Sequence, residues 1–232
     1  MEHSHRTAIV TGGSRGLGRA LVRALADQGW RVVTDGRDAE ALERAVGDLD
    51  RVVAVPGDVT DPQHRRRLVD TAAEVGGGID LLVNNAGGLG PSPLPGLGDY
   101  PLDELVELFT VNVVAPLGLI QAALPSLVDR TGLIVNITSD AAVEAYEGWG
   151  GYGATKAALD HIGRVLAVEH PELRVLTIDP GDMRTQMHQD AFPGEDISDR
   201  PLPEGAVPGL LALIEGDERG GRHRVVPVEV AP

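Results

Sequence analysis

Apolar residues follow two alternating periods along most of this chain. The run Thr7–Thr11 is short, rich in β-branched residues and followed by glycine, which is typical of a buried strand. The next segment, Gly16–Gln28, places Leu17, Leu21 and Leu25 four residues apart, on one face of a helix. A strand followed at once by a helix is therefore the first predicted unit.

The same alternation continues to the end of the chain. Further strands are predicted at residues 31–34, 51–55, 79–83, 133–138, 174–179 and 222–228. Further helices are predicted at residues 38–49, 61–75, 102–117 and onward to 128, and 152–169. Strands that alternate with helices in this way are parallel and joined by crossover helices. We therefore expect one domain over residues 1–232, a doubly wound α/β fold with about seven parallel strands and helices on both faces.

Two stretches rich in glycine and proline interrupt the pattern, at residues 87–101 and 187–208. Each follows a strand that leads to the expected ligand side of the sheet, so we expect both to be loops over the substrate site. The second stretch is also acidic, and we expect it to act as a mobile lid.

The composition limits the class of protein. The 232 residues are 42% hydrophobic and 24% charged, as in ordinary globular domains. No apolar run approaches the roughly 18–20 residues that span a bilayer, and the first residues, 1–6, are polar and carry no signal-peptide pattern. The absence of cysteine excludes disulfides, iron–sulfur clusters, thiolate zinc sites and cysteine nucleophiles. We expect a cytoplasmic protein and predict no metal site.

The charge limits the partners. Asp and Glu number 35 against 20 Lys and Arg, which gives a formal charge of −15. A field of that sign disfavours nucleic acids and anionic membranes as partners, although one local basic pocket for a phosphate stays compatible with it. We therefore expect a small-molecule substrate.

The turn after the first strand reads Thr11-Gly-Gly-Ser-Arg-Gly-Leu-Gly18. A dinucleotide pyrophosphate needs a tight turn, a close approach of the backbone and a helix N-terminus that faces the phosphates. Glycine meets the first two needs because it lacks Cβ. The spacing Gly12-x-x-x-Gly16-x-Gly18 differs from the common G-x-G-x-x-G pattern, but it too predicts dinucleotide binding.

A tyrosine and a lysine open the long helix predicted near residue 152. Tyr152 and Lys156 are four residues apart, so their Cβ atoms lie about 5–6 Å apart on one helix face. A phenol with a pKa near 10 is a poor acid–base group at neutral pH, and a neighbouring ammonium lowers that pKa. Ser139 ends the fifth predicted strand, where a hydroxyl can donate a hydrogen bond to a bound carbonyl oxygen.

Two further polar segments fit the same crevice. Asn84-Asn85-Ala86-Gly87 ends the fourth predicted strand, and its small residues allow a cofactor to approach closely. Asn112 stands in a helix between Val111 and Val113, where a buried amide needs hydrogen-bond partners. A structural amide network and a combined structural and relay role are both open for it.

In order and spacing these motifs resemble the short-chain dehydrogenase/reductase family over roughly residues 6–186. The resemblance implies a Rossmann-type fold, a nicotinamide cofactor and a catalytic tetrad. Tyr152 would be the general acid–base and Ser139 would orient the substrate oxygen. Lys156 would hold the nicotinamide ribose and lower the pKa of the tyrosine, and Asn112 would position a water in the proton relay.

The resemblance also implies the cofactor contacts. Asp58 matches the acid that contacts adenine, Asn85 the asparagine near the adenine ribose, and the segment after the sixth strand the one that contacts the nicotinamide carboxamide. The full set is Gly12, Ser14, Arg15, Gly16, Leu17, Gly18, Arg37, Asp58, Val59, Asn85, Ala86, Gly87, Tyr152, Lys156, Pro180, Gly181 and Thr185.

The second strand bears on the choice between NADP and NAD. An acid at its end binds the ribose 2′-hydroxyl of NAD, whereas a cation there binds the 2′-phosphate of NADP. Aligned from the start of the strand, Gly36 takes the acid position and Arg37 follows it, with Arg15 as a second cation. This favours NADP(H). If the strand ends one residue earlier, Asp35 becomes the ribose-binding acid and NAD(H) is preferred.

The segment between Ser139 and Tyr152 is expected to line the substrate pocket. Its candidate substrate-binding residues are Ser139, Ala141, Val143, Tyr146, Trp149 and Tyr152, joined from the two loops by Leu89, Leu94, Met187 and Phe192. Simple packing under a loop is an equally good interpretation for the aromatic ones. Their clustering in a chain with only 3% aromatics favours an apolar carbonyl substrate.

We therefore expect an oxidoreductase that moves a hydride between NADP(H) and a ketone, aldehyde or alcohol. Two alternatives stay open: an epimerase or dehydratase on the same fold, and a non-catalytic NADP(H)-binding sensor or scaffold. After Thr185 the family pattern is only partly echoed, by Gly220-Gly-Arg222. The resemblance implies a homodimer or homotetramer, with the long helix after Tyr152 as one face between copies.

Overall fold

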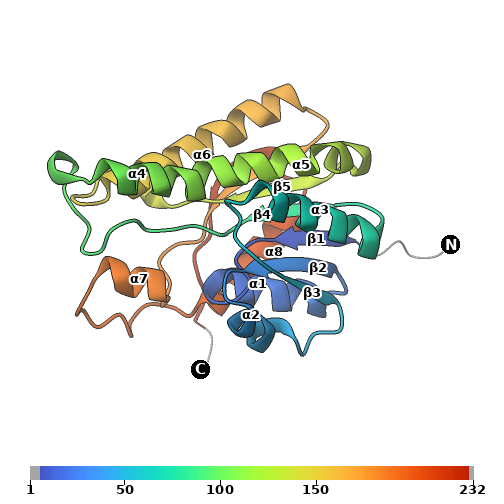
Figure 1. Cartoon of the computed structure of the whole chain (residues 1–232), viewed down its shortest axis with the longest axis horizontal. Coiled ribbons are helices and arrows are strands. Elements are labelled where there is room, and N and C mark those ends of the chain that lie inside the picture. The colour runs from blue at the N-terminus through green and yellow to red at the C-terminus, as the bar shows by residue number, and fades with distance from the viewer. Residues whose placement is uncertain (1–5, 230–232) are drawn as a thin grey trace.

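The computed structural model describes residues 6–229. Seven parallel strands form one sheet in the order β3-β2-β1-β4-β5-β6-β7. Figure 1 shows helices packed on both sides of this sheet. The chain starts in the middle of the sheet, builds one half outward to β3, then returns and builds the other half outward to β7. The topological switch point, where ligands bind in such sheets, lies between β1 and β4.

The strands and helices are short and follow one another closely. The strands are β1 (Thr7–Val10), β2 (Arg31–Gly36), β3 (Val52–Pro56), β4 (Leu81–Asn84), β5 (Leu133–Ile137), β6 (Arg174–Asp179) and β7 (Gly220–Arg224). The helices are α1 (Gly16–Asp27), α2 (Ala39–Val46), α3 (Pro62–Gly76), α4 (Leu102–Phe109), α5 (Ala115–Arg130), α6 (Gly150–Glu169), α7 (Gln186–Ala191) and α8 (Val207–Glu215). The predicted parallel α/β fold with seven strands is confirmed.

Helix starts follow local capping chemistry. The Asp38 carboxylate accepts a hydrogen bond from the Ala41 amide at the start of α2. Asp61 does the same for Gln63 at the start of α3, where Pro62 takes a position at which its missing N–H costs nothing. Because each of these helices follows a parallel strand, its N-terminus lies at the carboxyl edge of the sheet.

Two apolar layers enclose the sheet, one on each face. Helices α1, α2 and α8 cover one face, where Leu21 and Leu25 pack against Val10 and Val135. Helices α3, α5 and α6 cover the other, where Leu68, Leu119 and Leu166 belong to the second layer. All strands but the edge strands β3 and β7 are largely buried, as expected of a parallel sheet covered on both sides.

One helical stretch runs without a break from Leu102 to Arg130 through α4, a π-helical turn at Thr110–Val114, and α5. Two separate helices were predicted here. By length and composition alone the stretch could cross a membrane, so the expectation that no segment reaches this threshold was wrong. Its apolar residues are needed to cover the sheet, since Leu119, Ile120, Ala123 and Leu127 are fully buried in the core.

The C-terminal region differs most from the prediction. Residues 187–208, predicted as loop, contain most of α7, which Thr185 caps by accepting a hydrogen bond from the His188 amide. Helix α8 was not predicted, because its nine residues include Pro208 and Gly209. Strand β7 starts two residues earlier and ends four residues earlier than predicted, because hydrogen bonding to β6 rather than an apolar run defines this edge strand.

Candidate active site

The predicted site residues follow the carboxyl ends of several strands. The glycine-rich turn follows β1, Asn85 follows β4, Ser139 follows β5 and Pro180 follows β6. Because the strands are parallel, these segments meet along one edge of the sheet. The site is therefore assembled from residues far apart in the sequence.

Three glycines give the turn between β1 and α1 its shape. Gly12 has φ +76° and Gly16 has φ +55°, conformations that L side chains rarely adopt. A Cβ on Gly18 would collide with the Gly12 carbonyl oxygen, so the first turn of α1 lies directly against the backbone of the turn. Gly12 and Gly16 are thus required for their backbone torsions, and Gly18 for its close approach to the backbone of the turn.

Short side chains hold the turn against the end of β4. The Thr11 hydroxyl accepts hydrogen bonds from the Asn85 and Ala86 amides, both at 3.0 Å. The Asn85 side-chain amide donates to the Thr11 carbonyl at 2.7 Å. Asn85, which the family resemblance places near the adenine ribose, therefore holds the turn with its own side-chain nitrogen. Thr11 was not singled out from the sequence, although it directly precedes the glycines.

The start of α1 fits a bound phosphate. Its N-cap residue, Arg15, makes no side-chain cap hydrogen bond, and the first turn carries no acidic residue. The backbone N–H groups of this turn have no intrahelical acceptors and, together with the helix dipole, they favour an anion. Ser14 and Leu17 lie in the same segment. The turn and the helix N-terminus therefore fit the pyrophosphate of a dinucleotide, with the chain's own glycines making room for it.

Asp35 does not occupy a strand end. Strand β2 continues through Gly36, and the Asp35 side chain is 2% exposed. One carboxylate oxygen accepts a hydrogen bond from the Gly12 amide at 2.7 Å, and the other lies 3.0 Å from His64 Nε2. Both oxygens are thus engaged inside the protein. The register with Gly36 at the strand end and Arg37 next, exposed, is the one that the structure has.

Asp58 lies two residues after the carboxyl end of β3. Its Oδ1 accepts hydrogen bonds from the Thr60 amide and hydroxyl, both at 2.8 Å. Partial burial acts to raise the pKa of Asp58, but the hydrogen bonds from Thr60 and the charges of Arg37 and His64 outweigh it and lower that pKa. Asp58 is therefore ionised at neutral pH. The carbonyl of the adjacent Val59 accepts a hydrogen bond from Arg65 at 2.6 Å.

Tyr152 and Lys156 lie buried on the first turns of α6, 8% and 5% exposed. The Lys156 ammonium donates to the Ile137 carbonyl at 2.9 Å and lies 5.5 Å from the centre of the Tyr152 ring. Burial lowers the pKa of Lys156 to about 8, against the opposing charge of Asp160. Burial also raises the pKa of Tyr152 above its usual value, and the carboxylates of Asp179 and Asp140 add to this. Burial thus outweighs the lowering that the neighbouring lysine was expected to produce.

Ser139 lies where β5 passes into a 3-10 turn at Asp140–Ala142. Its hydroxyl accepts a hydrogen bond from the Ala141 amide at 3.2 Å and donates to the Asp140 carboxylate at 3.0 Å. The Ser139 hydroxyl also acts to lower the pKa of Tyr152. Ser139 and Tyr152 therefore belong to one polar group at the carboxyl end of β5.

Asn112 lies in the π-helical turn and is buried. Its carbonyl oxygen accepts a hydrogen bond from the Gly88 amide at 2.8 Å, and its nitrogen donates to the Gly88 carbonyl at 2.9 Å and to the Thr155 hydroxyl at 3.0 Å. Thr155 in turn donates to the Tyr152 carbonyl at 2.7 Å. The amide therefore ties the segment after β4 to α6, which is the structural role considered for it. Thr155 was missed, although it lies inside the Tyr-x-x-x-Lys motif.

An apolar cluster surrounds Tyr152. The Trp149 ring meets the Tyr152 ring edge-on at 5.7 Å and lies 6.0 Å from Phe192. The other members of the cluster are Leu89, Leu94, Leu108, Ala141, Met187 and Ala191. Both glycine- and proline-rich segments thus reach the tyrosine, as their candidate residues predicted. Leu108 and Ala191 were missed because nothing in the local pattern distinguishes them from other helical apolar residues.

Two candidate substrate residues lie outside this cluster. Tyr146 is 47% exposed, and its hydroxyl donates to the Asp140 carboxylate at 3.1 Å. Val143 is 61% exposed. Both belong to the surface segment between Ser139 and Trp149, which turns away before Gly148 redirects the chain into α6.

The segment after β6 returns to the glycine turn. Gly181 has φ +75°, and its amide donates to the Asp179 carboxylate at 3.0 Å. The Thr185 methyl lies within van der Waals reach of a Cβ placed on Gly16. The chain from Pro180 to Thr185 therefore connects the two ends of the crevice.

Comparisons with known proteins agree with this architecture. A family model described as short chain dehydrogenase matches residues 6–196. An uncharacterized oxidoreductase of Staphylococcus aureus (strain MW2) is 34% identical over 185 residues, which cover 78% of this chain and 79% of that protein. The crystal structure of the KRED1-Pglu enzyme is similar with a TM-score of 0.86 and 31% identity, covering 95% of this chain and 100% of that one.

A third similar protein is an alcohol dehydrogenase from the archaeon Thermococcus sibiricus, whose structure contains 5-hydroxy-NADP. It is 26% identical, with a TM-score of 0.86, and the match covers 98% of this chain and 99% of that one. The family model and the oxidoreductase relatives cover most of the chain, and the residues that the family model matches include every motif of the crevice. The chain is therefore an oxidoreductase enzyme of the short-chain dehydrogenase family.

Proposed function

We propose that this enzyme transfers a hydride between NADP(H) and the carbonyl or alcohol carbon of a small apolar molecule. The observation that carries the proposal is the grouping of the half-buried Ser139 with the buried Tyr152 and Lys156 at the carboxyl end of β5, next to a turn that fits a dinucleotide. A nicotinamide cofactor bound there supplies or accepts the hydride. The chain's residues orient the substrate and move the accompanying proton.

In the reducing direction, the Tyr152 phenol gives its proton to the carbonyl oxygen as the carbon receives the hydride, and an alcohol forms. The Ser139 hydroxyl donates a hydrogen bond to that oxygen and stabilises the charge that develops on it. Protonated Lys156 favours the phenolate that remains, and, as the family resemblance implies, it would hold the ribose of a bound cofactor. The oxidising direction uses the same atoms in reverse, with Tyr152 as the base.

NADP(H) is the preferred cofactor in this proposal. Arg37 follows the end of β2 and is exposed, with Arg15 exposed in the glycine turn. Asp35, the acid that would favour NAD(H), is buried and holds Gly12 and His64 instead. The Thermococcus sibiricus protein was solved with an NADP derivative, which agrees with this preference.

The substrate class follows from the cluster around Tyr152. Trp149, Met187 and Phe192 are partly buried against it and offer apolar surface to a ligand. An apolar ketone or aldehyde gains by covering that surface, whereas a charged substrate finds no countercharge among these side chains. The segments 87–101 and 187–208 then form the two walls of the substrate site. The oxidoreductase relatives favour this reaction over an epimerase, a dehydratase or a sensor without turnover.

We also propose that two copies associate through α6, as the family resemblance implies. Val165 and Val168 are 40% and 81% exposed on that helix, which is apolar surface that a second copy would cover. Light scattering of the 24.4 kDa chain checks this directly. The cytoplasm stays the predicted compartment.

The test is steady-state reduction of a panel of apolar ketones and aldehydes with NADPH, in the wild type and in Tyr152→Phe. We expect turnover by the wild type and a loss of about 1000-fold or more in the variant, since the phenol's proton transfer is removed. The affinity of Tyr152→Phe for NADPH should stay within a few-fold of the wild-type affinity. The matched control is Tyr146→Phe, which lies on the exposed segment and should keep full activity. Equal turnover in Tyr152→Phe and wild type would refute the assignment.

A further inference from the structure

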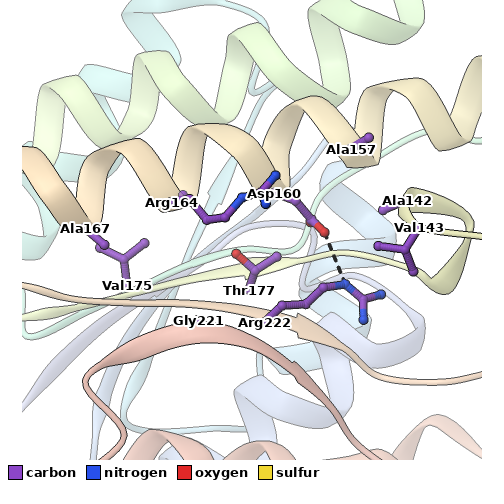
Figure 2. A pocket seen from close by; sticks show the side chains of 11 residues that line it. Ala142, Val143, Ala157, Asp160, Arg164, Ala167, Val175, Thr177, Gly221 and Arg222 are labelled. Carbon is purple, nitrogen blue, oxygen red and sulfur yellow. Dashed lines mark hydrogen bonds and ion pairs between the residues drawn. The ribbon is translucent and has the colours of Figure 1, made fainter.

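The structure has a cavity of about 210 Å³ between α6 and the strands β6 and β7 (Figure 2). Helix α6 forms one wall with Asp160 and Arg164, β6 contributes Thr177, and the edge strand β7 contributes Arg222. The two arginines line the same cavity but differ in their contacts. Arg222 points toward α6 and reaches Asp160, whereas no ion pair of Arg164 is found among residues 6–229.

Arg222 connects three elements of the catalytic region. Its Nε donates to the Asp160 carboxylate on α6 at 3.2 Å. Its Nη2 donates to the backbone carbonyl of Ser139, after β5, at 2.9 Å, and lies 3.5 Å from the Asp179 carboxylate at the end of β6. The planar fork of a guanidinium allows one side chain to make all of these contacts at once.

Each group that Arg222 contacts is a neighbour of Ser139, Tyr152 or Lys156, or belongs to one of these residues. Asp160 follows Lys156 by four residues, as Lys156 follows Tyr152, so the three side chains share one face of α6. Asp160 and Asp179 have side chains only 8% and 4% exposed, so their charges are weakly screened by water. The Ser139 carbonyl belongs to the residue whose hydroxyl orients the substrate oxygen.

We propose that Arg222 is a positioning residue, which fixes Ser139 against α6 and, by neutralising Asp160 and Asp179, sets the pH range in which Lys156 and Tyr152 exchange protons. The proposal rests on the proposed function for its catalytic meaning, but the charge coupling itself exists without turnover. In this proposal β7, which carries Arg222, contributes to catalysis by positioning other residues.

The charged groups around Lys156 and Tyr152 determine the direction in which their pKa values change when Arg222 is removed. Asp160 on α6 acts to raise the pKa of Lys156, and Asp179 on β6 and Asp140 in the 3-10 turn raise that of Tyr152. From β7, Arg222 opposes Asp160 and Asp179, and Arg224 lies 3.7 Å from Asp179 with a side chain 60% exposed. The neutral Asn112, from the π-helical turn, and Gly88, from the segment after β4, are the other neighbours of this part of α6. Removing the Arg222 charge leaves both carboxylates less opposed, so both catalytic groups hold their protons to higher pH.

The chain offers an unusually direct measurement, because Lys156 is its only lysine. Protein grown with ¹³C-labelled lysine gives one side-chain signal, whose chemical shift reports the protonation of Lys156 in the intact enzyme. The titration is compared in the wild type, Arg222→Met, Arg222→Gln and Arg222→Lys. The control is Arg164→Met, which removes the same charge from the same cavity.

We expect the wild-type midpoint near pH 8 and a midpoint higher by about half a unit to one unit in Arg222→Met and Arg222→Gln. Arg222→Lys keeps the charge and should titrate like the wild type, and so should Arg164→Met. With turnover established, the basic limb of the pH profile for alcohol oxidation should move in the same direction by the same amount. A purely structural role would lower activity without moving either midpoint.

Coincident midpoints in the wild type and Arg222→Gln would overturn the proposal, as would an equal shift in Arg164→Met. If Arg222→Met fails to fold, Arg222→Gln and Arg222→Lys still carry the comparison, since both can reach the Ser139 carbonyl. A wild type without turnover would refute the proposed function while leaving the titration result standing on its own.

Discussion

The two halves of the crevice are built in different ways. The cofactor half is held by backbone groups and short polar side chains, with Thr11, Gly12 and Asn85 hydrogen-bonded to one another across β1 and β4. The substrate half is an apolar cluster whose members, among them Trp149 and Phe192, come from segments far apart in the chain. Backbone torsions dictate the first half, and the packing of side chains dictates the second. A substitution in the cofactor half should therefore abolish most of the cofactor affinity. A substitution in the substrate half should weaken substrate binding only in part.

The largest effect is expected in the cofactor half from Gly18→Ala. The added methyl group collides with the Gly12 carbonyl and with the Asn85 side chain, so the turn must open. We expect NADPH affinity to fall by about 100-fold or more, because the phosphate contacts depend on a close approach of the backbone. Fluorescence titration measures it, and circular dichroism checks that the fold persists.

Gly96→Ala is the matched control for that substitution. Gly96 lies in the segment before α4, and a Cβ there has no neighbour within 4 Å. It should bind NADPH like the wild type. Normal binding by Gly18→Ala would show that the close approach at this turn is not required.

A middle-sized effect is expected where the two halves meet, at Lys156. Its pKa of about 8 in the folded protein is lower than in the unfolded chain, so the folded state binds fewer protons between these values. Stability relative to Lys156→Met should therefore rise with pH, by about 2 kcal/mol between pH 7 and pH 9.5. Urea unfolding of both proteins at the two pH values measures this difference. A difference that stays constant would mean that the buried amine titrates normally.

The smallest effect is expected in the substrate half from Trp149→Ala. The variant loses one apolar wall beside Tyr152 but no backbone contact of the cofactor. We expect the KM for an apolar ketone to rise by about tenfold, with kcat changed less, because a lost apolar contact of this size weakens binding by about 1–2 kcal/mol. Steady-state kinetics with one large and one small ketone check it. A loss of NADPH affinity in this variant would break the division between the halves.

The same contrast explains how much the sequence could predict. The alternation of strands and helices and the glycine turn could be predicted, because a positive φ or a capped helix start depends on only a few neighbouring residues. Asp35 shows the limit of such local prediction. Its position could be aligned from the sequence, but its partner His64 comes from α3 and was not foreseeable.

The C-terminal elements were least predictable. Helix α8 contains a proline and a glycine, and β7 consists of Gly220–Arg224, a polar segment whose identity as a strand depends on its pairing with β6. The π-helical turn around Asn112 is likewise a tertiary feature, since the amide needs Gly88 and Thr155 in place. Where structure depends on partners distant in the chain, periodicity alone carries too little information.

The most direct test of the central claim is the affinity of the purified enzyme for NADPH and NADH, measured by nicotinamide fluorescence in the wild type and in Arg37→Ala. We expect the wild type to bind NADPH at least about tenfold more tightly than NADH, and Arg37→Ala to lose about 10- to 100-fold of its NADPH affinity with NADH little changed. Arg51→Ala, at an exposed position just before β3, is the control and should leave both affinities unchanged. Tighter binding of NADH by the wild type, or an unchanged NADPH affinity in Arg37→Ala, would contradict the account.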